Sequence, residues 1–157
     1  MGLPEIFISF QTAAVSAITR SARGVLAVAV KDATAGGAAE AAYKSLAEVP
    51  EDKFSPENYR LLKLAFLAAP TKVWVLRVGE DAEKTYQALE RLRFDWLAAP
   101  GLEDARVMSF IKTLRNGGRG VKAVVANATA PDCEGIVNLC VSGLTLEDGA
   151  MEAKDYA

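Results

Sequence analysis

Carboxylates that could do chemistry follow three of the strand-like segments in this sequence. Asp81, Asp104 and Asp132 each come shortly after such a segment, and carboxylate oxygens are ligands that Mg²⁺ prefers. Parallel strands present their carboxyl ends at one edge of a sheet, so a magnesium site built from these aspartates is one interpretation. The other is structural, because acidic side chains in the first turn of a helix satisfy its dipole. We favour the structural interpretation and predict no metal site.

Other residues that enzymes commonly use are missing. The 157 residues include no histidine, which excludes serine–histidine and cysteine–histidine nucleophiles and histidine-based zinc sites. No glycine-rich phosphate motif follows a strand, and acids at the helix starts repel phosphate. The glycine-dense stretch at 116–120 follows a helix instead of opening one, so we expect a turn there, with Arg119 as a candidate partner contact. We therefore predict no catalytic residue, no cofactor and no enzyme activity.

Composition narrows the class of protein further. Hydrophobic residues make up 51% and charged residues 24% of the chain, which is typical of a globular domain. The net charge of −2 gives no basic face for nucleic acid. The strand-like apolar run at 25–30 is far shorter than the roughly 20 residues of a membrane span, so no membrane insertion is expected. Cys133 and Cys140 form no C-x-x-C pair, and we expect two buried free thiols.

The N-terminus is predicted to be an arm. Residues 5–10 contain a loose alternation of apolar side chains and are expected to form a short strand. Residues 11–23 are rich in Thr, Ser and Ala and are expected to be a linker. A lone strand must pair either with the edge of its own sheet or with the sheet of a neighbour, and the residues leave both open. Arg20 and Arg23 are either solvated or form salt bridges between subunits.

The body alternates strands with helices. Ser55 and Pro56 indicate the start of a helix whose inner face carries Tyr59, Leu62, Phe66 and Ala69. The pattern predicts an α/β fold, namely a three-layer α/β/α arrangement with a mostly parallel sheet, preceded by the N-terminal β-strand arm. The expected strands are 25–30, which Lys31 and Asp32 close, 73–78, 94–99, 121–126 and 135–141, with an edge segment within 41–49. The expected helices start near 55, 82 and 103, with Asp81 as the cap of the second and with Val107, Ile111 and Leu114 on the inner face of the third. Trp74 and Trp96 lie within strands, where we expect them to pack in the core.

Three segments are expected along the chain. Residues 1–23 form the arm and linker, and residues 24–141 form the core domain. Residues 142–157 form a β-hairpin around an Asp-Gly turn, followed by the start of a further segment with a helical pattern.

The order of these features resembles the contractile phage tail sheath family, in the short form found in prophages of Gram-positive bacteria. The similarity covers nearly the whole chain, and the ordered set of motifs is more specific than any one of them. The motifs are Ile6–Phe10, Thr19–Gly24, Asn58-Tyr59, Pro70–Gly79, Phe94–Gly101, Ile111–Gly117, Lys122–Asn127 and Glu134–Asn138.

The resemblance implies a structural protein. Members of this family stack as rings around a rigid tail tube and contract to drive the tube through a cell envelope, and their central fold is likened to subtilisin without its activity. Their arms exchange strands between neighbouring subunits, with an extensible linker that here is 11–23. Carried to this sequence, the donated strand consists of Glu5, Ile6, Phe7, Ile8, Ser9 and Phe10, and Arg20 and Arg23 are candidates for inter-subunit salt bridges.

The resemblance also implies partners and a location. Neighbouring sheath subunits would form a helical or ring-stacked homo-oligomer, and a tail tube protein would be contacted through a C-terminal region that this sequence lacks. The 157 residues would thus correspond to an N-terminal piece, found in a virion tail or tail-like particle and assembled in the bacterial host cytoplasm. The alternative function is a small cytosolic α/β enzyme or nucleotide-binding module.

Overall fold

A six-stranded sheet organises the part of the chain that the structure describes. The computed structural model describes residues 24–127, 131–140, 144–146 and 149–151. The sheet has the strand order β2-β3-β1-β4-β5-β6. Its strands are β1 (Val25–Val30), β2 (Glu40–Tyr43), β3 (Lys72–Arg77), β4 (Trp96–Ala98), β5 (Lys122–Val125) and β6 (Ile136–Asn138).

The predicted α/β class is confirmed. β1 runs parallel to both β3 and β4, and β4–β5 and β5–β6 are also parallel pairs. β2 pairs with β3 in the antiparallel sense at one edge, where the sequence indicated an edge segment. The central position of β1 explains its composition, because a strand that is covered on both faces needs apolar side chains on both.

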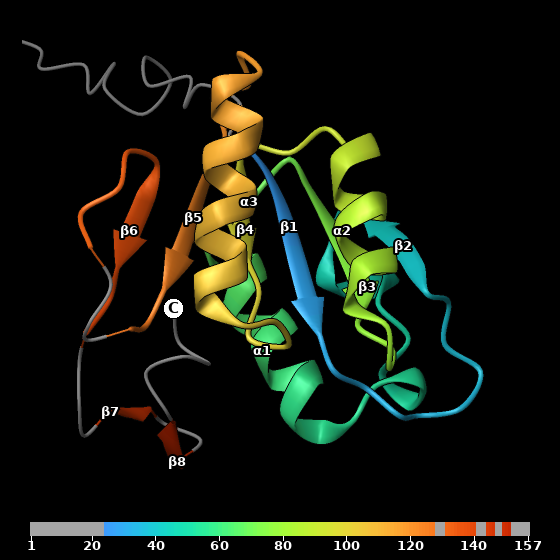
Figure 1. Ribbon diagram of the computed structural model, residues 1–157. Helices are drawn as coiled ribbons and strands as arrows, with labels where there is room; N and C mark the ends of the chain where they lie inside the picture. The colour runs from blue at the N-terminus through green and yellow to red at the C-terminus, as the bar shows by residue number, and fades with distance from the viewer. Residues whose placement is uncertain (1–23, 128–130, 141–143, 147–148, 152–157) are drawn as a thin grey trace, which may run out of the picture.

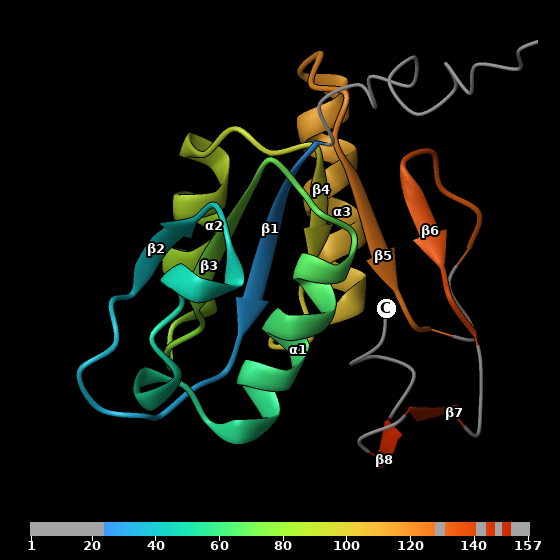
Figure 2. The ribbon, with the colours of Figure 1, turned by 180° about the vertical axis from the view of Figure 1, so that it is seen from behind.

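Helices cover both faces of the sheet, as Figures 1 and 2 show from opposite sides. The helix α1 (Pro56–Leu67) lies on one face, and α2 (Ala82–Arg91) and α3 (Asp104–Asn116) lie on the other. Two short 3₁₀ turns, Leu46–Glu48 and Glu51–Lys53, connect β2 to α1. β7 (Leu144–Leu146) and β8 (Gly149–Met151) form a separate antiparallel pair, where the hairpin was expected.

Two hydrophobic clusters fill the space between the layers. On the α1 face, Leu62 is fully buried against side chains of β1 and β3, including Val28 and Val73. On the other face, Leu89 of α2 and Ile111 of α3 pack against β1, β3, β4 and β5. Each of these three helical side chains has no exposed surface, and burial of such a side chain contributes about 2 kcal/mol.

The helix starts follow the local sequence. The Ser55 hydroxyl accepts a hydrogen bond from the Asn58 backbone N–H at 3.3 Å, and Pro56 occupies the first helical position of α1. The Asp81 carboxylate accepts from the Glu83 backbone N–H at 3.0 Å and caps α2. Both caps confirm the sequence-based prediction, because short polar side chains at this position satisfy an otherwise unpaired N–H group.

Removing the α2 cap gives a first prediction. Asp81→Ala is expected to lower the free energy of unfolding by about 1 kcal/mol, because the Glu83 N–H loses its acceptor. Urea unfolding followed by circular dichroism measures this change. Asp52→Ala is the control, since Asp52 lies on the surface and pairs with the neighbouring Lys53. An equal loss in both variants would contradict the capping role.

Three expectations for individual side chains are wrong. Ala69 lies beyond α1, is exposed and has a backbone φ of 48°, so it does not continue the buried helical face. Trp96, expected in the core, is 37% exposed because no helix of the described residues covers that side of β4. Cys133 and Cys140 are free, but Cys133 is half-buried and Cys140 is exposed, since both lie outside β6.

Candidate functional site

The sheet topology creates a crevice at its carboxyl edge. From β1 the chain crosses through α1 to β3 on one side, and later strands continue on the other side of β1. Such a reversal of strand order is where open α/β sheets commonly bind ligands. An open crevice of about 710 Å³ lies here, and the residues lining it include Lys31, Asp32, Gly79, Glu80, Tyr86, Gly101, Glu103 and Arg106.

Gly101 holds the β4–α3 loop against the end of β1. Its backbone N–H donates to the Ala29 carbonyl at 3.0 Å. A Cβ at position 101 would lie only 2.7 Å from the backbone nitrogen of Lys31 and 2.9 Å from the carbonyl carbon of Val30. Only glycine fits this approach, so this residue type fixes one wall of the crevice.

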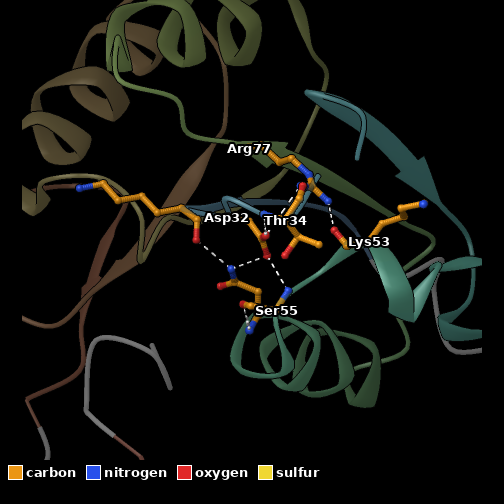
Figure 3. A network of polar contacts seen from close by, with 7 residues as sticks. Asp32, Thr34, Lys53, Ser55 and Arg77 are labelled. Carbon is orange, nitrogen blue, oxygen red and sulfur yellow. Dashed lines mark hydrogen bonds and ion pairs between the residues drawn. The ribbon is translucent and has the colours of Figure 1, made fainter. Parts of the chain in front are cut away.

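A buried carboxylate joins two segments beside the crevice (Figure 3). The Asp32 side chain has no exposed surface and accepts hydrogen bonds from the backbone N–H groups of Thr34 at 2.8 Å and Ser55 at 2.9 Å. The Asn58 side-chain amide donates to Asp32 at 2.7 Å and to the Lys31 carbonyl at 2.8 Å. The loop after β1 is thereby tied to the start of α1.

Arg77 extends this network to β3 (Figure 3). One guanidinium nitrogen lies 3.7 Å from the Asp32 carboxylate and donates to the Thr34 carbonyl at 2.8 Å, and another donates to the Lys53 carbonyl. The guanidinium also stacks over the Phe54 ring, with its central carbon 4.6 Å from the ring centroid. Burial alone would raise the pKa of Asp32, but hydrogen bonds from Thr34, Ser55 and Asn58 outweigh it and hold that pKa well below its usual range.

The opposite wall of the crevice carries Tyr86. Its side chain is 6% exposed and its ring contacts Phe110 with centroids 5.1 Å apart. The Tyr86 hydroxyl is buried and has no hydrogen-bond partner among the described residues, and burial raises its pKa. Arg106 lies over the ring at 5.1 Å from its centroid and pairs with Glu83 at 2.6 Å.

The acids singled out in the sequence do not converge. Asp81 caps α2, and Asp104 is the first residue of α3. Across the described ranges, no group of three or more His, Cys, Asp or Glu residues could hold a metal ion. The structure therefore does not bring Asp81, Asp104 and Asp132 together as one magnesium site.

Arg119 was a candidate partner contact, but it is engaged within the chain. Its guanidinium donates to the carbonyls of Glu90 at 2.9 Å and Leu92 at 2.6 Å and stacks over the Phe94 ring. The side chain thus ties the loop after α3 to the end of α2. The predicted donated strand, from Glu5 to Phe10, and the arginines Arg20 and Arg23 lie outside the described residues.

One half of the sheet's α1 face is not covered by a described helix. The α1 cluster contains side chains of β1 and β3 and none of β4, β5 or β6, and Figure 2 shows β5 and β6 beside α1 rather than beneath it. Trp96 of β4 and Val137 of β6 project from this half and are 37% and 46% exposed. Lys122 of β5 lies over the Trp96 ring at 5.1 Å from its centroid. Among the described residues, this half of the sheet thus presents two exposed apolar side chains and the cation of Lys122.

Comparison with known proteins shows which proteins this chain resembles in sequence. A tail sheath protein from Clostridium phage phiCD119 is 32% identical over an alignment of 154 residues that covers 87% of this chain. This chain is a relative of phage tail sheath proteins. The resemblance predicted from the ordered motifs is thereby confirmed, and the chain spans 41% of that curated relative's length.

A solved sheath protein structure shares the fold of this chain. The crystal structure of the sheath tail protein Lin1278 from Listeria innocua superimposes with a TM-score of 0.67 at 16% identity, over 87% of this chain and 54% of that chain. No family model matches the sequence. Among the described residues of this chain, no helix has the length and apolar character needed to span a membrane.

The sequence did not reveal two side-chain arrangements of this chain. They are the buried network around Asp32 and the unpartnered hydroxyl of Tyr86. Asp32 was seen only as the residue closing a strand, and Asn58 only as part of a motif. The signal was present in the Ser55-Pro56 helix start, because a helix start beside a strand end leaves backbone N–H groups that a nearby carboxylate can satisfy. Nothing in the spacing of Tyr86 indicated an unpaired hydroxyl, which depends on what α3 and the loops place around it.

Proposed function

We propose that this chain is part of a structural subunit of a contractile phage tail sheath. The observation that carries the proposal is the 32% identity to a tail sheath protein over 87% of this chain, in agreement with the shared fold of a second sheath protein. The role is structural and not enzymatic, and it places the protein in a virion tail or tail-like particle assembled in the host cytoplasm. Neighbouring sheath subunits and a tail tube protein are its partners.

The arm supplies the connection between subunits in this proposal. Residues 5–10 add as a strand to a neighbouring subunit, 11–23 act as an extensible linker, and 24–141 form the rigid body. The donated strand carries Ile6, Ile8 and Phe10 on one face, which suits a strand with one buried side. Strand addition relies on backbone hydrogen bonds and little on side-chain chemistry, and the soft linker tolerates the subunit rotation that contraction requires.

An enzyme or nucleotide-binding module remains the competing function. The crevice occupies the usual ligand position of a doubly wound sheet, but Glu80 and Glu103 line it and oppose phosphate binding. A thermal shift screen against ATP, NAD, FMN and S-adenosylmethionine separates the two functions, because a ligand of the native state raises the melting temperature. A flat response is expected from a structural subunit.

Electron microscopy tests the sheath proposal directly. The product of the complete reading frame is purified and examined in negative stain, and tubules of uniform width are expected. Small discrete particles, together with a positive ligand screen, would overturn the proposal.

The arm is tested in the same product with Ile8→Pro. Proline removes a backbone donor from the donated strand, so tubule formation is expected to be lost. Ile8→Val is the matched control, because it retains the N–H group and a β-branched side chain, and its tubules should match the unsubstituted protein. Normal tubules from Ile8→Pro would contradict strand donation while leaving the sheath role intact.

A further inference from the structure

We propose that the crevice at the carboxyl edge of the sheet is an arginine-binding site for the Arg20–Arg23 segment of a second copy of this chain. The inference rests on the proposed sheath function and names the partner surface within it. Three properties of the molecule support the assignment: the charge of the crevice, an unsatisfied buried hydroxyl, and the distance along β1 between the arm and the crevice.

Charge is the first of these properties. Glu80 and Glu103 line the crevice, and neither side chain has an ion pair or hydrogen bond among the described residues. Arg106 is paired with Glu83 at 2.6 Å, so Lys31 is the remaining cation on the lining. A cationic side chain is therefore the complementary occupant.

The Tyr86 hydroxyl is the second property. A buried polar group without a partner costs about 1–3 kcal/mol, so this hydroxyl is a strong acceptor for an incoming donor. The Arg106 side chain lies over the Tyr86 ring and is exposed, and in this proposal it shifts when the incoming guanidinium binds. A guanidinium presents five N–H donors in a planar fork and can serve a carboxylate and a hydroxyl together. Arginine fits the crevice better than lysine for this reason.

Distance makes the contact intermolecular. The described chain begins at Gly24, at the amino end of β1, whereas the crevice begins at Lys31, beyond its carboxyl end. The strand between them is about 20 Å long. An extended chain spans at most about 3.6 Å per residue, so the backbone of Arg20 reaches about 14 Å from Gly24, and that of Arg23 reaches about 4 Å. The two arginines cannot both enter the crevice of their own chain, so in this proposal they enter the crevice of a second copy.

A peptide titration tests the site on the full chain. The probe is a fluorescein-labelled synthetic peptide with the sequence of residues 14–24, and binding is followed by fluorescence anisotropy at low salt. The unsubstituted peptide is expected to bind, and a peptide carrying Arg20→Glu and Arg23→Glu is expected to bind roughly tenfold more weakly. The full chain with Glu80→Arg and Glu103→Arg should reverse this preference and bind the glutamate peptide better.

A matched pair of tyrosine variants and one charge-reversal control test the specificity of the result. Tyr86→Phe removes only the hydroxyl and is expected to weaken peptide binding by about fivefold, whereas Tyr59→Phe, on the opposite face of the sheet, should leave it unchanged. Glu90→Arg, an exposed reversal on the same helix as Tyr86, should also leave it unchanged.

Two outcomes would overturn the arginine site. One is the absence of binding by the unsubstituted peptide up to millimolar concentration. The other is equal binding by both peptides to the unsubstituted chain. Neither result bears on tubule formation, so failure of this site and failure of the sheath proposal are distinguished by the two experiments.

Discussion

Asp32→Ala is expected to lower the free energy of unfolding by about 3 kcal/mol at pH 7. The substitution leaves the buried N–H groups of Thr34 and Ser55 and the amide of Asn58 without an acceptor. It also removes the carboxylate nearest to Arg77, whose side chain is only 9% exposed. Hydrogen bonds to a charged group are worth about 1.5–3 kcal/mol each, and loss of one member of a buried network leaves the others unpaired.

The same carboxylate makes stability depend on pH. The pKa of Asp32 is lowered in the folded chain, so its contribution is fully present above the ordinary aspartate pKa of about 4 and is lost progressively as pH falls below that value. The difference between the unsubstituted chain and Asp32→Ala is therefore expected to be largest at neutral pH and smaller at pH 3. Urea unfolding at both pH values measures it.

Asp52→Ala serves again as the control for Asp32. Asp52 is exposed and pairs with Lys53 at 3.0 Å, so its removal is expected to change stability by less than about 1 kcal/mol. If Asp32→Ala unfolds with the same midpoint as Asp52→Ala, the buried network does not stabilise the fold.

The second large effect is expected from Gly101→Ala. The added Cβ would lie 2.7 Å from the Lys31 nitrogen and 3.1 Å from the Ala29 carbonyl oxygen, and both are backbone atoms of the central strand or the residue after it. The loop must move away and weaken its hydrogen bond to Ala29, so we expect a loss of roughly 2–3 kcal/mol. The displaced loop would also alter the shape of the crevice.

Gly79→Ala is the matched control for Gly101. Gly79 lies in the corresponding loop after β3 and lines the same crevice, but a Cβ there meets nothing within 4 Å. We expect a change of less than about 1 kcal/mol, of either sign. Thermal unfolding of the two variants side by side measures the difference. Similar melting temperatures would show that the approach of Gly101 to β1 does not constrain the fold.

Much of the fold could be predicted because its signals are local. The apolar run of β1, the Ser55 and Asp81 caps and the inward stripe of α3 each depend on residues within a few positions of one another. The alternation of strands and helices then restricts the sheet to a mostly parallel arrangement with crossovers of one hand. The family resemblance also came from sequence, because it rested on the order of motifs along nearly the whole chain.

The arrangement of side chains at the carboxyl edge could not be predicted in the same way. The acids at the strand ends were all candidates for one site, but each sits in a different loop, and the sheet order decides which loops meet. β1 lies between β3 and β4, so Glu80 and Glu103 line one crevice while the predicted trio does not converge. Trp96 was assigned to the core from strand alternation, which gives a side chain's face but not whether a helix covers that face.

The sequence by itself thus determined the class of fold, the helix starts and the resemblance to sheath proteins, since local pattern and motif order carry these. The tertiary structure decided the rest. It placed Asp32 where three segments meet. Among the described residues, it left the Tyr86 hydroxyl without a partner and half of one sheet face without a covering helix. These features depend on contacts between residues far apart in the chain, and no local pattern records which distant groups will surround a buried polar atom.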